Sequence, residues 1–361
     1  MKSSALSRIA VVVLACLASI AGGLSLGRGG AGAAVSQRRP LIGFSADTLK
    51  EERWQHDVNF FVERAKTLGA DVLVQAANSD DTRQIRDIEA LISRKVDVLV
   101  VVPHDGAAMA KAVAMAHEAG IPVIAYDRII LNSDLDFYVT FDVPKIGATQ
   151  AQYLIDRIKP GHKMRVVRIN GAKTDHDAFL VREGQDRALK PYIQRGQLEI
   201  VHDDWAAEWK PEVAKKIVNA AITRFGHGID AVLAANDGTA GGAIQALTEE
   251  GLVGKVLVTG GDGELAACQR IVHGTQSMTV FQPVNELAAH AAEVAVKMAR
   301  KRPVIATAET SNKLIEVPTA AVDVVAMTRS NMTELAVKRG YLRFDDIYRD
   351  APPALRPPRP G

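Results

Sequence analysis

Short apolar runs rich in β-branched residues alternate with longer amphipathic stretches from residue 41 onward. One of these runs, 96–102, is apolar nearly throughout, which is typical of a strand buried on both faces. The alternation predicts an α/β fold with parallel sheets and right-handed crossovers. The predicted strands are 41–46, 71–75, 96–102 and 122–126, and the predicted helices are 52–68, 82–94 and 107–119.

The second half of the chain repeats this plan. Residues 95–113 resemble residues 228–247, and residues 119–127 resemble residues 253–262. Further strands are predicted near 165–169, 199–203, 229–234, 256–259 and 278–281. The repeat predicts two similar Rossmann-like α/β lobes that face each other.

Polar residues follow the predicted strands, where ligands bind in open parallel sheets. They are Asp47, Asp105, Asp127, Arg128, Asn236, Asp237 and Asp262. Asp105 and Asp237 each precede a glycine and a helix, which favours helix capping. "YDR" (126–128) instead follows a wholly apolar strand with an acid and an arginine together, which favours a ligand site.

The N-terminus has the pattern of a secretory signal. Lys2 and Arg8 precede an apolar run, 9–20, and small residues follow it up to 34. We therefore expect residues 1–34 to be a cleaved signal peptide, with the cut near residue 33 or 34, and the mature chain to reach the periplasm. The apolar run is shorter than the ~20 residues of a membrane span. An uncleaved anchor, or a lipid anchor at Cys16, is the alternative.

Composition narrows the class of protein. The chain of 361 residues carries 47% apolar and 24% charged residues, as soluble globular proteins do. Loss of residues 1–34 removes three basic residues and no acid, so the formal charge falls from +2 to −1, which gives no electrostatic case for a nucleic-acid partner. Cys268 would then be the only cysteine, so we expect no internal disulfide.

No catalytic motif is complete. "GFSAD" (43–47) lacks the last glycine of the nucleophile elbow, and neither a phosphate-binding loop nor a dinucleotide-binding glycine motif is present. The three adjacent side chains of "DHD" (175–177) do not converge as metal ligands from separate elements do. The sequence therefore predicts a protein that is not an enzyme and has neither cofactor nor metal.

The remaining candidates are hydrogen-bonding groups and three tryptophans. "ERWQHD" (52–57) places Arg53 beside Trp54 at the start of a predicted helix. Paired carboxylate oxygens and the guanidinium fork match vicinal hydroxyls, and aromatic plates match the C–H faces of a sugar ring. This set of residues favours a sugar-binding site over an ordinary helix surface.

Several blocks in the same order carry a resemblance to a known family. They are "ERWQHD", "AYDRII", "DFYVTFD", "ANDGTAGGAIQAL", "DGELAACQRIVHGTQSMTV" and "WAAEW" (205–209), spread over about residues 40 to 340. The chain resembles the type I periplasmic sugar-binding proteins of the ribose-binding class, and among them the D-xylose-binding proteins of ABC transporters.

The resemblance implies a function and a site. A monosaccharide, D-xylose or a related aldose, would be held between the lobes, with Trp54 and Trp209 facing each other across the ring, and delivered to a membrane permease by a monomeric receptor; a chemoreceptor is a further implied partner. The implied ligand-binding residues are Arg53, Trp54, Asp127, Arg128, Asp177, Trp209, Asn236, Asp262 and Gln282. Two of them depart from the family pattern, because the xylose binders carry Asn at the position of Asp177 and Lys at that of Gln282.

The lobes are expected to be joined by a hinge of three chain crossings, near 142, 282 and 315, and the implied domain boundaries follow from these crossings. The N-terminal lobe would comprise 40–142 and 283–314, and the C-terminal lobe 143–282 and 315–330. A C-terminal extension, 331–350, would end in a disordered proline-rich tail, 351–361.

Two other classes of protein share this fold. A sugar-responsive regulator would need an N-terminal DNA-binding helix pair, where this chain has its export signal. An extracytoplasmic enzyme would need a nucleophile and a base, which the sequence does not supply.

Overall fold

The computed structural model describes residues 38–360. The predicted signal peptide, 1–34, and Cys16 lie outside the described residues. Within the described part, no helix is both long and apolar enough to cross a membrane.

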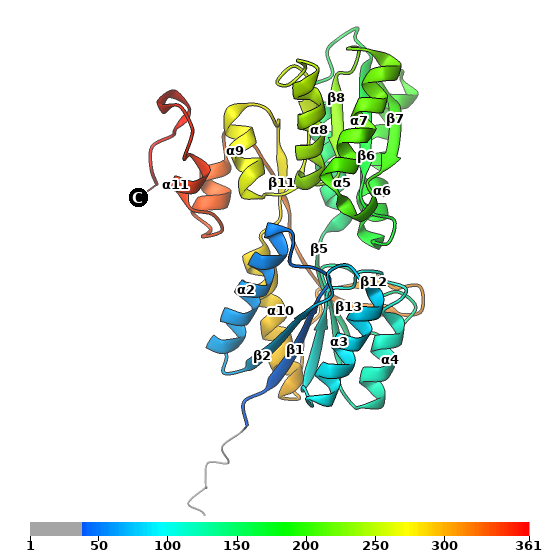
Figure 1. Cartoon of the computed structure of the whole chain (residues 1–361), viewed down its shortest axis with the longest axis vertical. Helices are drawn as coiled ribbons and strands as arrows, with labels where there is room; N and C mark the ends of the chain where they lie inside the picture. The colour runs from blue at the N-terminus through cyan, green and yellow to red at the C-terminus, as the bar shows by residue number, and fades with distance from the viewer. Residues whose placement is uncertain (1–37, 361) are drawn as a thin grey trace, which may run out of the picture. The chain divides into compact units, whose positions relative to one another are not determined.

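The first lobe is built on a seven-stranded sheet with the order β12-β13-β5-β4-β3-β1-β2. Its strands are β1 (Leu41–Ala46), β2 (Asp71–Ala76), β3 (Val98–Val101), β4 (Val123–Tyr126), β5 (Phe137–Phe141), β12 (Ala308–Ser311) and β13 (Glu316–Val322), and its helices are α2 (Glu52–Thr67), α3 (Asp81–Ser93), α4 (Ala110–Glu118) and α10 (Val284–Ala299). All pairs are parallel except the β12–β13 hairpin. Figure 1 shows α2 and α10 side by side against this sheet.

The second lobe is built on a four-stranded parallel sheet with the order β7-β6-β8-β9. Its elements are α5 (Val143–Ile155), β6 (Met164–Asn170), α6 (His176–Gln194), β7 (Leu198–Trp205), the short 3-10 helix η1 (Ala207–Trp209), α7 (Pro211–Phe225), β8 (Ala231–Ala234), α8 (Asp237–Glu249) and β9 (Leu257–Val258). Helices α5 and α6 cover one face of the sheet, and α7 and α8 cover the other.

A small third sheet has the order β10-β11-β14 and continues the second lobe. It consists of β10 (Gly261–Asp262), β11 (Thr279–Phe281) and β14 (Val325–Met327), flanked by α9 (Leu265–His273). β14 runs antiparallel to β11, as β12 does to β13, so the predicted parallel arrangement is extended by an antiparallel strand at these two sheet edges.

Both faces of each main sheet are buried, which explains the nearly continuous apolar strands. In β3, Val98 and Val100 belong to the core beneath α2 and α10, whereas Leu99 and Val101 belong to the core beneath α3 and α4. Successive side chains of one strand thus pack into the cores on opposite faces of the sheet, because they alternate in direction along a strand.

The chain passes between the lobes three times. The first crossing lies at Asp142, between β5 and α5, and the second lies at Gln282 and Pro283, between β11 and α10. The predicted third crossing near 315 was wrong. Residues 316–322 form β13, which pairs with β5 and β12 in the first sheet, so the chain crosses just before β14, at residues 323–324.

The predicted disordered tail was also wrong within the described residues. The extension contains a π-helical turn, η2 (Thr333–Val337), then α11 (Phe344–Ile347) and a 3-10 turn, η3 (Pro353–Leu355). Arg356 donates to the backbone oxygens of Arg349 at 2.9 Å and Ala351 at 2.8 Å, so the tail folds back on the extension despite its prolines.

Helices α5 and α6 pack unusually closely near the start of the second lobe. A Cβ on Gly147 would lie 1.8 Å from the carbonyl oxygen of Val181, and one on Gly184 would lie 1.9 Å from that of Pro144. Only glycine permits this approach. It fixes the first turn of α6, which follows Asp175 and carries Asp177, against the helix that begins at the first crossing.

Candidate functional site

The nine residues implied by the sequence come together around two adjoining cavities between the lobes. Each cavity has a volume of about 50 Å³. The first is lined by Arg53, Asp127, Asp177, Trp209, Asn236, Asp262 and Gln282, and the second adds Trp54 and Arg128. Asp175 lines both cavities and was not among the implied residues.

Arg53 links the two lobes at the centre of this site. It lies in the first turn of α2 and is only 8% exposed. Its guanidinium contacts Asp127 of its own lobe directly and lies 3.3 Å from the Asp262 carboxylate of the other lobe. A third carboxylate, Asp57, lies 3.4 Å from its Nε one helical turn later. A guanidinium stays charged even when it is buried, so these acids offset the free-energy cost of removing it from water.

Asp127 is presented by a strained turn at the end of β4. Its φ of 65° lies in the left-handed region, and the amide of Arg128 donates to the carbonyl of Tyr126 across it at 2.8 Å. The hydroxyls of Tyr138 and Thr140 both donate to the Asp127 carbonyl, at 2.6 and 2.9 Å. Such strain persists only where neighbouring groups hold it, and it is common at ligand sites.

Arg128 forms a second connection between the lobes. Its Nη1 donates to Asp47, at the end of β1, at 2.8 Å, and its Nε lies 2.8 Å from the Asp175 carboxylate of the second lobe. The other oxygen of Asp47 lies 3.0 Å from a ring nitrogen of His104. Asp47, which follows the first predicted strand, therefore positions Arg128.

The two implied aromatic plates both border the second cavity. Trp54 is 3% exposed, and the guanidinium carbons of Arg53 and Arg128 lie 4.6 and 5.1 Å from its ring centroid. Trp54 is therefore a core residue as well as part of the cavity wall. Trp209 has a φ of 55° and donates from Nε1 to Asp175 at 3.2 Å.

Trp209 rests on Gly171, just beyond β6. A Cβ on Gly171 would lie 2.1 Å from the far edge of the indole ring, so any side chain here would displace the tryptophan. The glycine therefore allows the indole to lie flat against the backbone beside the cavity.

The remaining second-lobe groups converge on Asp262. Gln282 donates to its Oδ1 at 2.8 Å, and Asn236 lies at 3.5 Å from its Oδ2. Asn236 also caps α8 by accepting from the amide of Thr239 at 2.9 Å. Asp262 itself has a φ of 101°, a second strained acid at the site.

The two predicted capping acids have different outcomes. Asp105 accepts from the amides of Ala107 and Ala108 at 2.8 and 2.9 Å, but it caps only the turn before α4, because that helix begins at Ala110 and has Met109 as its N-cap residue. The prediction for Asp237 was wrong, because Asn236 is the cap and Asp237 is fully buried behind it. Its carboxylate instead accepts from the amides of the loop after Asp262, at 2.9 and 3.0 Å, and holds that loop in place.

Buried acids outnumber the two arginines at the site, and burial shifts their titration. Burial raises the pKa of Asp262 to about 8 although Arg53 opposes the shift, and it raises the pKa of Asp57 to about 7. Burial likewise raises the pKa of Asp175, against the opposing charge of Arg128. Some carboxyl groups of the site are therefore protonated near neutral pH.

Asp177 is the least satisfied of these acids. Its Oδ1 is shielded from solvent and has no hydrogen-bond partner among residues 38–360. Burial, together with the negative charges of Asp175 and Asp127, raises the pKa of Asp177 well above its ordinary value. A buried acceptor that lines a cavity and has no partner can accept a hydrogen bond from a ligand.

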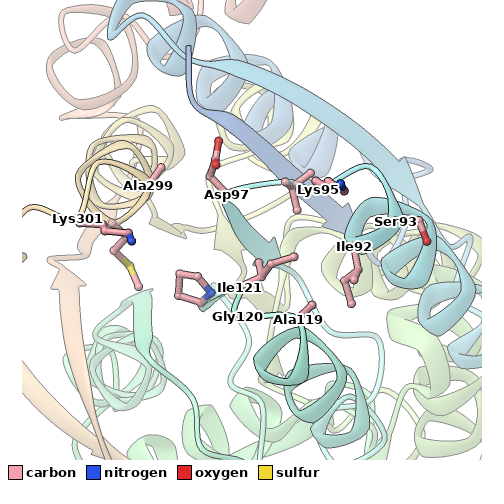
Figure 2. A pocket seen from close by; sticks show the side chains of 12 residues that line it. Ile92, Ser93, Lys95, Asp97, Ala119, Gly120, Ile121, Ala299 and Lys301 are labelled. Atoms are coloured by element: carbon pink, nitrogen blue, oxygen red, sulfur yellow. The ribbon is translucent and has the colours of Figure 1, made fainter. Parts of the chain in front are cut away.

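A larger cavity lies elsewhere and has different chemistry. It measures about 600 Å³ and borders the residues just before β3 and β4, at the opposite end of the first sheet from Asp127 (Figure 2). Ile92, Ile121 and Met298 contribute apolar surface, and Lys95 and Lys301 lie at separate edges. It has neither an arginine nor an aromatic side chain in its lining, so volume alone does not mark the functional site.

Sequence reasoning missed Asp175 and Gly171. Asp175 was considered only as part of a metal motif, yet it connects Arg128 to Trp209. Its place beside a candidate ligand at 177, in the stretch after the predicted strand 165–169, was the available signal. Gly171 carried no signal, because its role depends on where the indole of Trp209 lies.

Comparison with known proteins agrees with this architecture. The model of the periplasmic binding protein domain matches residues 42–303. The chain belongs to the periplasmic binding protein family, and the type I fold expected from the sequence is confirmed.

Particular relatives are more informative still. The D-xylose-binding periplasmic proteins of Haemophilus influenzae and Escherichia coli are 44% and 42% identical to the chain, each over 85% of it and 92% of their own length. Among solved structures, a carbohydrate transporter solute-binding protein from Chloroflexus aurantiacus in complex with D-glucose has a TM-score of 0.79 at 32% identity, covering 84% of this chain and 97% of that one. The role of each individual side chain at the site stays a prediction.

Asp177 makes the stability of the protein depend on pH. Because its pKa is raised in the folded state, the folded protein keeps a proton that the unfolded chain loses above about pH 4. The free energy of unfolding therefore falls as the pH rises from about 4 toward the folded-state pKa of Asp177, because the unfolded chain then gains stability by losing this proton. We expect Asp177→Asn to raise the free energy of unfolding by roughly 1–3 kcal/mol at pH 8, and by much less at pH 5.

Urea unfolding of wild type and variant at both pH values measures this difference. Asp134→Asn removes the same charge from an exposed position and serves as the control. A variant that is destabilised at pH 8, or a difference that is equal at the two pH values, would contradict the account.

Proposed function

We propose that the chain is an extracytoplasmic solute-binding protein that captures a neutral monosaccharide, D-xylose or a related aldose, between its lobes and delivers it to an ABC transporter permease. The observation that carries this proposal is the pair of buried arginines, Arg53 and Arg128, each held between carboxylates of both lobes and both close to the ring of Trp54.

The charge at the site supports a neutral ligand. Both guanidinium groups are already paired with carboxyl groups, so no unpaired positive charge is left to attract an anionic ligand. A sugar hydroxyl donates one hydrogen bond and accepts others, so it suits both the carboxylates and the arginine forks. The indole of Trp209 supplies an aromatic plate beside these groups.

Entry of a sugar requires the lobes to part. Arg53 contacts Asp262, and Arg128 contacts Asp175, directly across the gap between the lobes. A sugar ring in this space replaces part of these direct contacts with contacts through its hydroxyls. The three crossings at 142, 282–283 and 323–324 are the segments that absorb the rotation.

The relatives support the same proposal. The curated relatives named above are D-xylose-binding, and a solute-binding protein from Clostridium phytofermentans with bound β-D-glucose has a TM-score of 0.79 at 30% identity. These relatives are binding proteins, which supports a receptor without catalytic activity. Residence in the periplasm, a permease partner and a monomeric state belong to the same proposal.

Gln282 and Asp177 should broaden the choice of sugar. A lysine at 282 would offer a charged donor to a hydroxyl, whereas the neutral amide of Gln282 both donates and accepts and here bonds to Asp262. Charge-assisted bonds are about twice as strong as neutral ones. We expect calorimetry to find D-xylose bound with at least one of arabinose, ribose, glucose and galactose within ~10-fold in affinity, and Gln282→Lys to narrow that range.

Gln152→Lys, at an exposed position on α5, is the matched control and should leave the ranking unchanged. If wild type binds xylose alone and Gln282→Lys keeps the same ranking of sugars, the prediction of a broadened specificity is wrong. If no sugar binds, the proposed function itself fails.

Closure of the lobes on sugar should be visible in solution. Without ligand, hydration of the buried charges of Arg53 and Arg128 competes with the contacts across the gap, so open forms are populated. We expect the radius of gyration from small-angle X-ray scattering to fall when the bound sugar saturates the protein. A sugar that does not bind in the titration serves as the control, and identical curves with and without bound sugar would refute the hinge closure.

A further inference from the structure

An aromatic cluster lies outside the two central cavities. It is centred on Trp205, the last residue of β7, which is half-buried. The ring of Phe179, 42% exposed, lies 4.6 Å from the ring of Trp205. Phe179 is one of four large apolar side chains that are exposed within residues 38–360. The proposed function makes no use of this cluster.

A separate cavity adjoins Trp205. It measures about 330 Å³, and Trp205 shares its lining with Lys173, Asp204 and Glu208 of the second lobe and with His104 of the first. The amine of Lys173 lies 5.7 Å from the Trp205 ring centroid. The cavity therefore combines an aromatic wall with groups that donate and groups that accept hydrogen bonds.

The segment 205–209 separates this cavity from the central ones. Trp205 lines the outer cavity and Trp209 lines the inner pair. Between them, Glu208 and Trp209 both take left-handed backbone conformations, with φ of 52° and 55°. The contacts from His104 through Asp47 to Arg128 form the rest of the wall on the first-lobe side. A sugar in one cavity therefore does not occupy the other.

We propose that Trp205 and the outer cavity form a second carbohydrate site, which takes one neutral pyranose ring, either as a free sugar or as the end of a glycan. Glu208 is paired with Lys210 at 2.8 Å and His104 lies 3.0 Å from Asp47, which leaves Lys173 and Asp204 with opposite charges in the lining and favours a ligand without net charge. The indole offers a surface for the C–H face of the ring, and the four polar side chains match its hydroxyls.

The outer cavity shares no lining residue with the central cavities, so a ligand can bind there whether or not the central site takes a sugar. Because His104 comes from the first lobe and Trp205 from the second, a ring in this cavity contacts both lobes. Its occupancy would favour the arrangement in which the lobes are together, and would couple to binding at the centre by linkage.

Fluorine NMR of the chain labelled with 5-fluorotryptophan tests the proposal directly. The chain has three tryptophans, so Trp54, Trp205 and Trp209 give three signals, which single Trp→Phe variants assign. In a titration with D-xylose, we expect the Trp205 signal to show a second saturable shift, at concentrations at least ~10-fold above those that saturate the other two signals. Methyl β-D-xylopyranoside and xylobiose distinguish the sources. Tighter binding than xylose indicates the end of a glycan, and equal or weaker binding indicates a free sugar.

Lys173→Ala should weaken the second phase about tenfold, the scale expected for loss of a charged hydrogen-bond donor. Tyr192→Ala removes a half-buried aromatic side chain beside Arg195, at the far end of α6, and should leave the phase unchanged. A Trp205 signal without a second phase would overturn the proposal, and so would a second phase that Lys173→Ala does not alter. Failure of the central site would instead appear as unmoved Trp54 and Trp209 signals.

Discussion

The buried positive charge of Arg53 is the constraint on which the rest of the site depends. A guanidinium that is 8% exposed loses most of its hydration and is tolerated only when carboxylates replace the lost water. Those carboxylates come from the end of β4, from the next turn of α2 and, across the gap, from the second lobe. Arg128 repeats the arrangement with Asp47 and Asp175. Two α/β lobes, which already share a hydrophobic cluster where α10 leads from the third sheet to the first, are thereby also joined through charge at their facing edges.

The same constraint explains why the surrounding backbone is strained. Asp127, Asp262 and Trp209 all have positive φ, and each is held by groups that have no part in the cavity lining. Tyr138 and Thr140 fix the carbonyl of Asp127, Asp237 fixes the loop after Asp262, and Gly171 gives room for Trp209. Strain of this kind presets the geometry of polar groups before a ligand arrives, which lowers the entropic cost of binding.

Much of the fold was predictable from local pattern. The apolar runs predicted strands such as β1 with its observed limits. Few polar residues interrupt a strand that is buried on both faces, so the ends of the run mark the ends of the strand. The short, exposed β12 hairpin strand was missed, and with it the true position of the third crossing, because "AETS" lacks an apolar period. Hydrogen bonds from Arg356 and the burial of Ala351 order a tail whose proline content suggested disorder.

The candidate site was predictable in part for a different reason. The acids at the ends of β4 and β10 were expected from topology, whereas Arg53, Trp54 and Gln282 were named through resemblance to a family. The contacts of Asp175 with Arg128 and of Trp205 with Phe179 join segments far apart in the sequence, so the local pattern offered only the position of Asp175 beside a candidate ligand. Asp237 was misjudged because two adjacent polar residues could each cap α8, and only the packing of the loop after Asp262 decides between them.

The most direct test of the central claim compares two arginines of the same helix. Arg53 lies buried at the site, and Arg64 lies in the last turn of α2, where it pairs with Glu293 at the surface. Calorimetric titration of D-xylose into Arg53→Met and Arg64→Met measures what each contributes. The account predicts that Arg53→Met loses affinity by about 100-fold or more, from the loss of charge-assisted bonds, while Arg64→Met stays within about twofold of wild type. A folded Arg53→Met variant that binds D-xylose as tightly as Arg64→Met would contradict it.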